Sequence, residues 1–444
     1  MMRDSGRPQS LQSAALWSIA LGTLFFLVYG TCNWLTSLRG SVKSFHWAWE
    51  QRIPFVPGMV VPYMSLDLFF VGAIFLCRRE EIATHAKRVT SAICIASACF
   101  LLFPLQFGFA RPATGGFSGL LFDWLKLDQP FNQFPSLHIT LRSIVWAPFG
   151  RRVRGPLRWA LIAWFVLIGL SVLLTYQHHV IDVIGGEFLT VIVFYLFPWN
   201  VKEETAGTGS FNARATLIYG VPATLLALIA VVLRPWGFLL AWPVCCLVLL
   251  SAAYAGTGPR MFRKREGRLS WAATALLLPY LIGSRISQAL HHRSTDPWNQ
   301  LTPNVLFGRL LRGQEASQLA DAGVIAVLDL TPECNEAGAL RERTYENIQI
   351  LDWTVPSAPQ LHRAVEFIRE HSRSGKVYVH CALGVSRSAG VVAAYLLESS
   401  RAATAEQAVE AVRKVRPKIV VTPGWMRLLR TLERPTVSVP IAAE

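Results

Sequence analysis

The chain is poor in charged residues, and acidic residues are the scarcer kind. Only 16% of its 444 residues are Asp, Glu, Lys or Arg, whereas 52% are hydrophobic, and 28 acidic residues face 43 basic ones. Such a composition excludes an intrinsically disordered chain and a coiled coil. It is also too apolar for an ordinary soluble protein, so we expect a large part of the chain to lie in a membrane.

The sequence also lacks a disulfide framework, internal repeats and low-complexity tracts. Six of its eight cysteines lie in or beside apolar runs, namely Cys32, Cys77, Cys94, Cys99, Cys245 and Cys246. Cysteines placed in this way do not suggest paired bridges.

Long apolar runs recur through residues 1–290 and predict a multi-pass α-helical membrane domain. A helix needs about 20 apolar residues to cross the hydrocarbon core. The first run, Ala14 to Leu35, is too long for a signal-peptide core, and we expect it to stay in the protein as a span. The runs lie at about 14–35, 57–77, 91–109, 137–149, 157–177, 180–198, 216–233, 236–256 and 269–283, of which the fourth and the ninth are short.

The positive charge is concentrated in this apolar part. Residues 1–299 hold 26 Lys and Arg against 13 Asp and Glu, whereas residues 300–444 hold 17 against 15. Positive loops beside membrane spans explain this excess better than a nucleic-acid-binding face, so no nucleic-acid partner is expected. The basic clusters at 78–88, 151–158 and 260–268 predict cytoplasmic loops, with the segments 110–136 and 177–180 on the opposite side.

From Pro297 onward, to about residue 436, the composition is that of a soluble α/β domain. Apolar, β-rich runs alternate with helical patterns. The expected strands are 324–330, 348–352 and 376–380, and the expected helices are 358–371, 388–398 and 404–415.

A β-rich run in this domain ends at Cys381, and a tight loop and a helical pattern follow. Such a loop turns backbone N–H groups inward at a helix N-terminus and binds an oxyanion without a metal or another cofactor. Arg387 can add a planar fork for two phosphate oxygens. The same positive field lowers the pKa of Cys381 below about 8.5, which makes the thiolate a nucleophile suited to phosphorus.

The residues His380-Cys381-x-x-Gly384-x-x-Arg387-Ser388 resemble the signature of the protein tyrosine phosphatase superfamily, in its dual-specificity branch, over residues 303–433. The resemblance implies a central, mostly parallel sheet flanked by helices and a cysteinyl-phosphate intermediate. It implies that Cys381 attacks, Arg387 grips the phosphoryl group, Ser388 assists release of the thiolate and Asp352 is the general acid. The loop residues Ala382, Leu383, Gly384, Val385 and Ser386 are then the phosphate cradle. We expect His380 to orient the loop and Cys334 to be structural.

A second group of polar residues lies on the side of the membrane opposite the basic loops. His138 and His178 each stand at the start of an apolar helix, where ionisable groups are costly and are functional candidates. Asp182, one turn after His178, can fix its tautomer and raise its basicity, while His138 can protonate a leaving group. This set predicts a metal-free phosphoryl-transfer site; a zinc site at His178, His179 and Asp182 is less favoured because the ligand set is not closed.

These residues resemble the type 2 phosphatidic acid phosphatase superfamily, especially its inositol-phosphoceramide synthase branch, over residues 55–198. The resemblance implies that His178 is a nucleophile, Asp182 its partner, His138 the general acid, and Arg111 and Ser136 phosphate ligands. Two cationic positions of the hydrolase pattern are occupied by Pro104 and Val172, which makes a transferase or a diminished hydrolase plausible. Arg142 is a candidate to replace one lost cation.

Together the two patterns predict a multi-pass phosphatase of the cell membrane, which we expect to be a bacterial inner membrane. Its expected partners are membrane lipids, and its expected substrate is a phosphorylated lipid or a phosphoprotein. The alternative is a lipid head-group phosphotransferase whose soluble domain regulates or binds phosphate; a third reading has phosphate-binding sites without turnover. The parity of the spans before the first basic cluster predicts a cytoplasmic amino terminus. Nine full spans from there would place the soluble domain outside the cytoplasm, and a re-entrant ninth segment would keep it inside.

Overall fold

The computed structural model describes residues 10–126, 129–199, 211–233, 236–293 and 295–433, and the chain divides into two compact units, 1–202 and 203–444. Within these described ranges, six helices are long and apolar enough to cross a membrane: Leu11–Ser37, Pro57–Leu76, Ile82–Leu102, Gly155–Leu174, Ala213–Val232 and Trp236–Phe262. A sheet-containing domain follows them. The fold class expected from the sequence, a multi-pass helical membrane part followed by an α/β domain, is confirmed.

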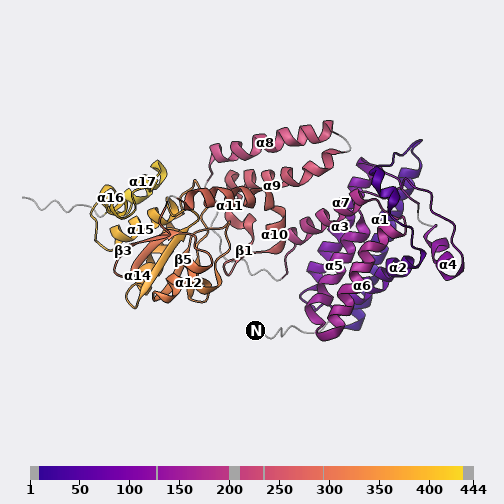
Figure 1. Cartoon of the computed structure of the whole chain (residues 1–444), viewed down its shortest axis with the longest axis horizontal. Coiled ribbons are helices and arrows are strands. Elements are labelled where there is room, and N and C mark those ends of the chain that lie inside the picture. Colours follow the sequence, from indigo (N-terminus) through magenta and orange to yellow (C-terminus); the bar gives the residue numbers. More distant parts are fainter. Residues whose placement is uncertain (1–9, 127–128, 200–210, 234–235, 294, 434–444) are drawn as a thin grey trace, which may run out of the picture. The chain divides into compact units, whose positions relative to one another are not determined.

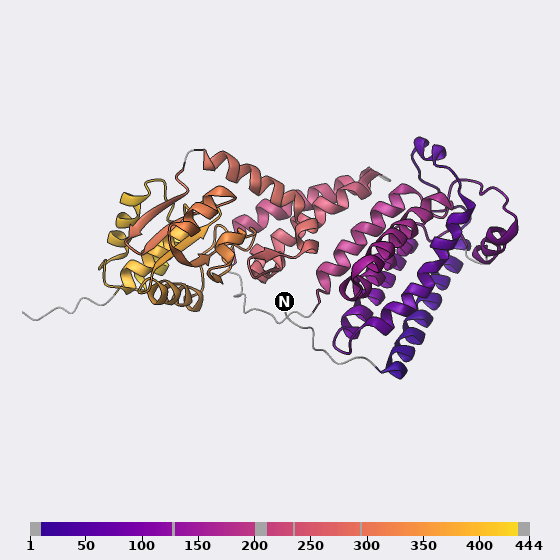
Figure 2. The same ribbon diagram turned by 60° about the horizontal axis from the view of Figure 1, so that its bottom comes forward.

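The first unit is a helical bundle whose long helices run alongside one another (Figures 1 and 2). Small residues allow the helices to approach closely, as at Gly186, where an added Cβ would lie 2.5 Å from the carbonyl oxygen of Ser136. The helices are α1 (Leu11–Ser37), α2 (Val60–Leu76), α3 (Ile82–Leu102), α4 (Gly116–Leu125), α5 (Leu137–Arg152), α6 (Gly155–Leu174) and α7 (Val180–Leu196), with short 3-10 turns η1 (Ala48–Arg52) and η2 (Pro57–Met59).

The two ends of this bundle differ in chemistry. At one end the buried carboxylate of Glu81 pairs with Arg151, 3.5 Å away, and with Arg152, which brings two of the predicted cytoplasmic clusters together. At the other end α5 and α7 begin side by side, because the Ser136 N–H donates to the Asp182 carbonyl at 2.9 Å. The candidate histidines therefore lie at the end opposite the basic clusters.

The second unit begins with an antiparallel helical pair, α8 (Ala213–Val232) and α9 (Ala241–Ala252), beside which α11 (Leu278–His292) lies (Figure 1). Shorter elements join them: η3 (Trp236–Leu240), the π turn η4 (Ala253–Thr257), η5 (Gly258–Phe262), the hairpin of β1 (Lys264–Arg265) and β2 (Arg268–Leu269), and α10 (Trp271–Leu276).

A five-stranded sheet forms the centre of the α/β domain, in the order β3-β4-β7-β5-β6. Only β3 is antiparallel to its neighbour; the other pairs are parallel, as strands joined by crossover helices must be. The elements are β3 (Trp298–Thr302), β4 (Val305–Arg309), α12 (Gln314–Asp321), β5 (Val324–Asp329), α13 (Gly338–Arg341), β6 (Thr344–Asn347), α14 (Ala358–His371), β7 (Lys376–Cys381), α15 (Arg387–Glu398), α16 (Ala405–Val415) and α17 (Pro423–Arg430).

Helices cover both faces of this sheet. Alternate strand residues such as Val377 and Val379 pack into one core with α14 to α17, whereas Tyr378 points to the other core with α12 and α13. Because side chains alternate along a strand, a strand buried on both faces reads as a continuous apolar run. Val377, Tyr378 and Val379 show this pattern in the sequence.

The helices of the second unit contact the α/β domain directly. Lys264, which the sequence groups with the loop cations, is buried, and its ammonium lies 2.5 Å from Asp329 at the end of β5. The Glu336 N–H donates to Gly267 O at 2.8 Å, and Leu351 shares a hydrophobic cluster with Cys246 and Leu250 of α9. The predicted limits of 1–290 and 297–436 remain predictions, and the described residues 211–233 and 236–293 include segments that pack with the catalytic domain that follows them.

Candidate functional site

Cys381 is the last residue of β7, and the loop 382–386 leads from it into α15, which begins at Arg387. The tight turn requires glycine at one position. Gly384 has a φ of +72°, and a Cβ there would lie 2.5 Å from the backbone carbon of Gly308 in β4. Only a residue without a side chain fits this conformation and this contact.

The sulfur of Cys381 lies inside the loop and accepts hydrogen bonds. The side chain is buried, the Gly384 N–H donates to Sγ at 3.3 Å, and the Ser388 hydroxyl lies 3.5 Å from it. Burial raises the pKa of the thiol, but the charge of Arg387 and the hydrogen bonds from Ser388 outweigh burial, so the pKa of Cys381 lies below its ordinary value. The geometry therefore favours a thiolate.

The guanidinium of Arg387 is held at one end and left open along one edge. Glu333 binds it in a bidentate manner, at 3.1 Å from Nη1 and 2.7 Å from Nη2, and Nη1 also donates to the Ile350 carbonyl at 3.0 Å. These contacts use three of the five N–H donors of arginine. Nε has no hydrogen-bond partner within the described ranges, so the Nε–Nη2 edge is available for two phosphate oxygens.

Asp352 lies beside this edge, on the loop between β6 and α14. Its Oδ1 is 3.7 Å from Arg387 Nε, and its side chain is 39% exposed, which leaves it open to a leaving group. Trp353, the next residue, has a φ of +58°, a sparsely populated conformation for a bulky residue. The Trp353 carbonyl accepts a 2.9 Å hydrogen bond from Asn212, the N-cap residue of α8. The candidate acid loop is thus tied to a membrane helix.

Two contributors to this site were not expected from the sequence. Glu333 stands on the loop after β5, and Asn212 stands over 130 residues before Asp352 in the sequence. The carboxyl ends of neighbouring parallel strands meet at one sheet edge. The position of Glu333 shortly after β5 could therefore have predicted that it lies near the loop after β7. No local pattern indicates Asn212, because its partner is a backbone carbonyl.

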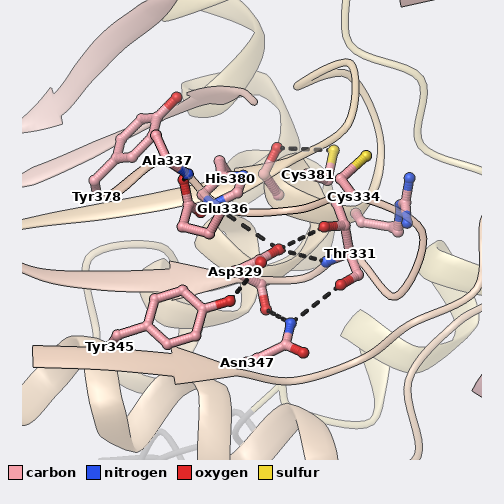
Figure 3. Close-up of polar contacts among 12 residues, drawn as sticks. Asp329, Thr331, Cys334, Glu336, Ala337, Tyr345, Asn347, Tyr378, His380 and Cys381 are labelled. Carbon is pink, nitrogen blue, oxygen red and sulfur yellow. Dashed lines mark hydrogen bonds and ion pairs between the residues drawn. The ribbon is translucent and has the colours of Figure 1, made fainter. Parts of the chain in front are cut away.

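A buried polar network lies under the cysteine loop (Figure 3). His380 Nε2 lies 2.6 Å from Glu336. Burial lowers the pKa of His380, but the carboxylates of Glu336 and Asp329 raise it more, so its pKa rises to about 9. Asp329 also accepts from Thr331 and Tyr345, and its pKa falls to about 2 because Lys264 and then His380 outweigh the effect of burial. His380 thus makes the contact that an orienting role requires.

Asp329, Glu336 and His380 are close enough together to hold a metal ion. The Lys264 ammonium already fills the cationic role, since it lies 2.5 Å from Asp329 Oδ2, 2.8 Å from Thr331 O and 3.1 Å from Thr331 Oγ1. All three of its N–H donors are thereby used. This donor set fits an internal ion pair rather than a metal site.

In the first unit, the structure brings Ser136, His178 and Asp182 to one end of the bundle. His178 Nδ1 lies 3.6 Å from Asp182 Oδ2. Ser136 is the N-cap of α5, two residues before His138, whose buried Nε2 has no hydrogen-bond partner among the described residues. His179 is engaged otherwise, since Glu50 lies 3.3 Å from its Nδ1 and the Gly108 N–H donates to its Nε2 at 3.0 Å.

The candidate phosphate cations of this end are already in contact with other groups. Arg111 donates to the Tyr176 carbonyl at 3.3 Å and lies over the ring of Phe122. Arg142 forms an ion pair with Glu187, so it is not an uncommitted replacement for a lost cation. Ser136 Oγ accepts from the Ile139 N–H at 3.4 Å as a helix cap. Glu50, which is buried and orients His179, is a further residue that the sequence pattern did not indicate.

Comparison with known families finds one matching domain in each unit. The model for the dual specificity phosphatase catalytic domain matches residues 310–435, and the PAP2 superfamily model matches residues 63–196. Phosphatidylglycerophosphatase and protein-tyrosine phosphatase 1 of Rattus norvegicus is 32% identical over 150 residues, which cover 31% of this chain and 77% of that protein. The chain belongs to the dual-specificity phosphatase family. Its first unit carries a PAP2 superfamily domain, so the fusion expected from the sequence is confirmed.

Other similar proteins match about a third of this chain. The Homo sapiens protein of the same name is 30% identical over 174 residues, 36% of this chain and 86% of its own length. The phosphatidylglycerophosphate phosphatase PTPMT2 of Arabidopsis thaliana is 29% identical over 144 residues, 31% of this chain and 63% of its own length. The crystal structure of PTPMT1 in complex with PI(5)P is 27% identical, covers 31% of this chain and 94% of its own, and has a TM-score of 0.29. The matched catalytic-domain model and the curated relatives of Rattus norvegicus and Homo sapiens are those of phosphatases, and this chain is a phosphatase as well.

Proposed function

We propose that this protein hydrolyses the phosphomonoester of a membrane phospholipid through a cysteinyl-phosphate intermediate on Cys381. The observation that carries the proposal is the thiol of Cys381 held 3.3 Å from the Gly384 N–H beside the open edge of Arg387. A thiolate, inward N–H donors and a free guanidinium edge are the parts that phosphoryl transfer to sulfur needs.

In the first step the Cys381 thiolate attacks phosphorus, the S–P bond forms and the bond from phosphorus to the alcohol oxygen breaks. Asp352 donates the proton that the leaving oxygen requires, and the open edge of Arg387 binds two phosphoryl oxygens as charge moves onto them. Glu333 holds the guanidinium in place from the opposite end.

In the second step water attacks the cysteinyl phosphate, the S–P bond breaks and inorganic phosphate leaves. Asp352, now a carboxylate, accepts the proton of the attacking water. The departing thiolate receives the hydrogen bond of Ser388, 3.5 Å away in the resting structure.

A phospholipid is favoured over a phosphoprotein because the catalytic domain packs against apolar helices of the same unit. The relatives named phosphatidylglycerophosphatase support a substrate of that class, a glycerophospholipid ending in a phosphomonoester. Tethering at a bilayer surface also raises the effective concentration of such a substrate.

Phosphate release from phosphatidylglycerophosphate and from an aryl phosphate by the detergent-purified full chain tests this function. Cys381→Ser should reduce both activities at least a thousandfold, and Asp352→Asn should lower turnover of the less activated lipid more than that of the aryl phosphate. Acid quenching should trap phosphate on Cys381. If Cys381→Ser keeps its turnover while His178→Ala loses it, the activity belongs to the membrane unit and the proposal fails.

We propose that the catalytic domain lies on the cytoplasmic side. The hairpin 264–269 belongs to a predicted cytoplasmic cluster and is bonded to the catalytic domain, since Leu269 N donates to Asn335 Oδ1 at 2.7 Å. The six helices that qualify as spans give an even number of crossings, and adding α5 and α7 keeps it even. Neither α10 nor α11 qualifies as a span, which favours a re-entrant or interfacial ninth segment. Of two reporters fused after residue 444, the one that works only in the cytoplasm should be active, and the one that works only outside the cytoplasm should be inactive.

The histidine site supports a second function, transfer of a phosphorylated head group between lipids. The unpartnered Nε2 of His138 near the His178–Asp182 pair favours a substrate-binding role, and Pro104 and Val172 stand where a hydrolase of this superfamily has cations. His178→Ala should remove a lipid product seen by mass spectrometry of cells, while Cys381→Ser should leave that product. Identical lipid profiles with and without His178 would eliminate this second function.

A further inference from the structure

A cavity of about 410 Å³ leads from the catalytic loop to the membrane helices of the second unit. One wall belongs to the catalytic domain and includes Arg387, Asp352 and Leu383. The opposite wall consists of residues from α8, α9 and α11. The volume of the cavity lies within the range of small-molecule sites, about 300–1,000 Å³.

The two ends of this cavity differ in polarity. The charged residues that line it, Glu333, Asp352 and Arg387, all belong to the catalytic wall. The α11 part has uncharged polar groups, among them Gln288, which donates to Cys334 Sγ at 3.5 Å. The α9 part presents apolar side chains, including Leu247 and Pro243.

The apolar part extends along a candidate membrane span. The lining residues of α9 run from Leu250, whose cluster includes Leu351 of the acid loop, to Pro243. Seven residues of α-helix correspond to about 10 Å. The stretch Trp236–Phe262, which contains α9, and its partner α8 are long and apolar enough to cross a bilayer, so this wall leads away from the catalytic residues along segments suited to the hydrocarbon region.

We propose that α9 and α11 form an acyl-chain site that selects diacyl phospholipids for Cys381. This inference rests on the proposed function, because it requires that the reacting phosphoryl group lies at Cys381 and Arg387. The phosphate binds at the charged end, the polar head group passes the α11 hydroxyl and amide groups, and an acyl chain lies along Leu247 toward Pro243. A phosphopeptide would place polar backbone against this wall, and leaving backbone groups unpaired there is unfavourable.

Gly283 of α11 gives a specific way to fill this site. It lines the cavity, and a Cβ at this position meets no atom within 4 Å, so a larger side chain can enter the cavity without displacing backbone. Its φ lies outside the left-handed region, so other residues are compatible with the helix. Ile282, the preceding residue, is 49% exposed and does not line the cavity, which makes it the position for a control.

The experiment compares phosphatidylglycerophosphate in mixed micelles with its deacylated head group, glycerophosphoglycerophosphate, using the detergent-purified full chain. The two substrates share the reacting phosphoryl group and differ only in the acyl chains. We expect kcat/KM to be at least a hundredfold higher for the acylated substrate. Gly283→Trp should lower the ratio of the two kcat/KM values at least tenfold, whereas Ile282→Trp should leave it within twofold of the wild-type ratio.

The outcomes separate this inference from the proposed function. If Cys381→Ser abolishes turnover of both substrates but Gly283→Trp leaves the ratio unchanged, the phosphatase function holds and the acyl-chain site is wrong. Equal kcat/KM for both substrates in the wild type, or a phosphotyrosyl peptide that exceeds the lipid, also overturns the inference. If Cys381→Ser retains turnover, the proposed function itself fails. Near-ultraviolet circular dichroism shows whether Gly283→Trp has kept the wild-type packing.

Discussion

Replacing Lys264 by Met should destabilise the second unit through Asp329. Methionine keeps the length of the side chain but removes the charge, which leaves a fully buried carboxylate bonded to Thr331 and Tyr345 without its ammonium partner. Removing one partner of a buried ion pair costs about 3–5 kcal/mol. For a unit of this size, each kcal/mol shifts the unfolding midpoint by about 2–4 °C, so we expect a midpoint lower by roughly 6–20 °C.

Thermal unfolding of the detergent-purified chain, followed with a thiol-reactive fluorophore, measures this effect because Cys334 is buried until the unit opens. Arg268→Met is the matched control, since it removes an exposed cation from the paired strand β2 and should change stability by no more than about 0.5 kcal/mol. The double variant Lys264→Met/Asp329→Leu removes both charges and should recover part of the loss. Equal midpoints for Lys264→Met and Arg268→Met would refute the ion-pair argument.

Three further predictions concern the loop, the acid and the pH dependence. The carboxylates of Glu336 and Asp329 raise the pKa of His380 to about 9. The contribution of protonated His380 to stability is therefore complete below pH 6.5 and is lost as the pH rises through 9. His380→Asn should flatten the decline of the unfolding midpoint between these two pH values. Ser388→Ala removes a hydrogen bond that lowers the pKa of Cys381, and it should move the acidic limb of the kcat/KM profile to higher pH; an unmoved limb would contradict this. Asn212→Asp keeps the α8 cap but loses the donor to Trp353, worth about 0.5–1.5 kcal/mol. We expect kcat to fall about 2- to 13-fold in stopped-flow assays and the unfolding midpoint to fall by no more than about 6 °C; unchanged kcat would mean that the tether does not position the acid loop.

The cysteine loop was predictable because its residues are contiguous in the sequence. The strand before Cys381, the glycine at position 384 and the helix starting at Arg387 lie within a short segment, so local conformation alone brings the N–H groups, the thiol and the guanidinium together. The mostly parallel sheet followed from the resemblance. Cys334 is buried and donates to no catalytic group among the described contacts, as a structural role requires.

The partners that hold this loop were not predictable from local patterns. Glu333, Asn212 and Lys264 reach Arg387, Trp353 and Asp329 across 54, 141 and 65 residues. Each is an ordinary polar residue on a loop, cap or hairpin when read alone. Lys264 even resembled a solvated loop cation, because its sequence neighbours are basic, and only the folded chain shows that it is buried.

The described segments 211–233 and 236–293 therefore contact the catalytic domain in three different ways. Lys264 neutralises a carboxylate under the cysteine loop, Asn212 fixes the backbone next to Asp352, and the α9 cluster covers Leu351, which would otherwise be an exposed apolar side chain. An anchor that served only to attach the domain to a bilayer would need none of these contacts. Because all three converge on the loops that hold Cys381, Arg387 and Asp352, the segments that carry Asn212, α9 and Lys264 stabilise the catalytic site as well as anchoring the domain.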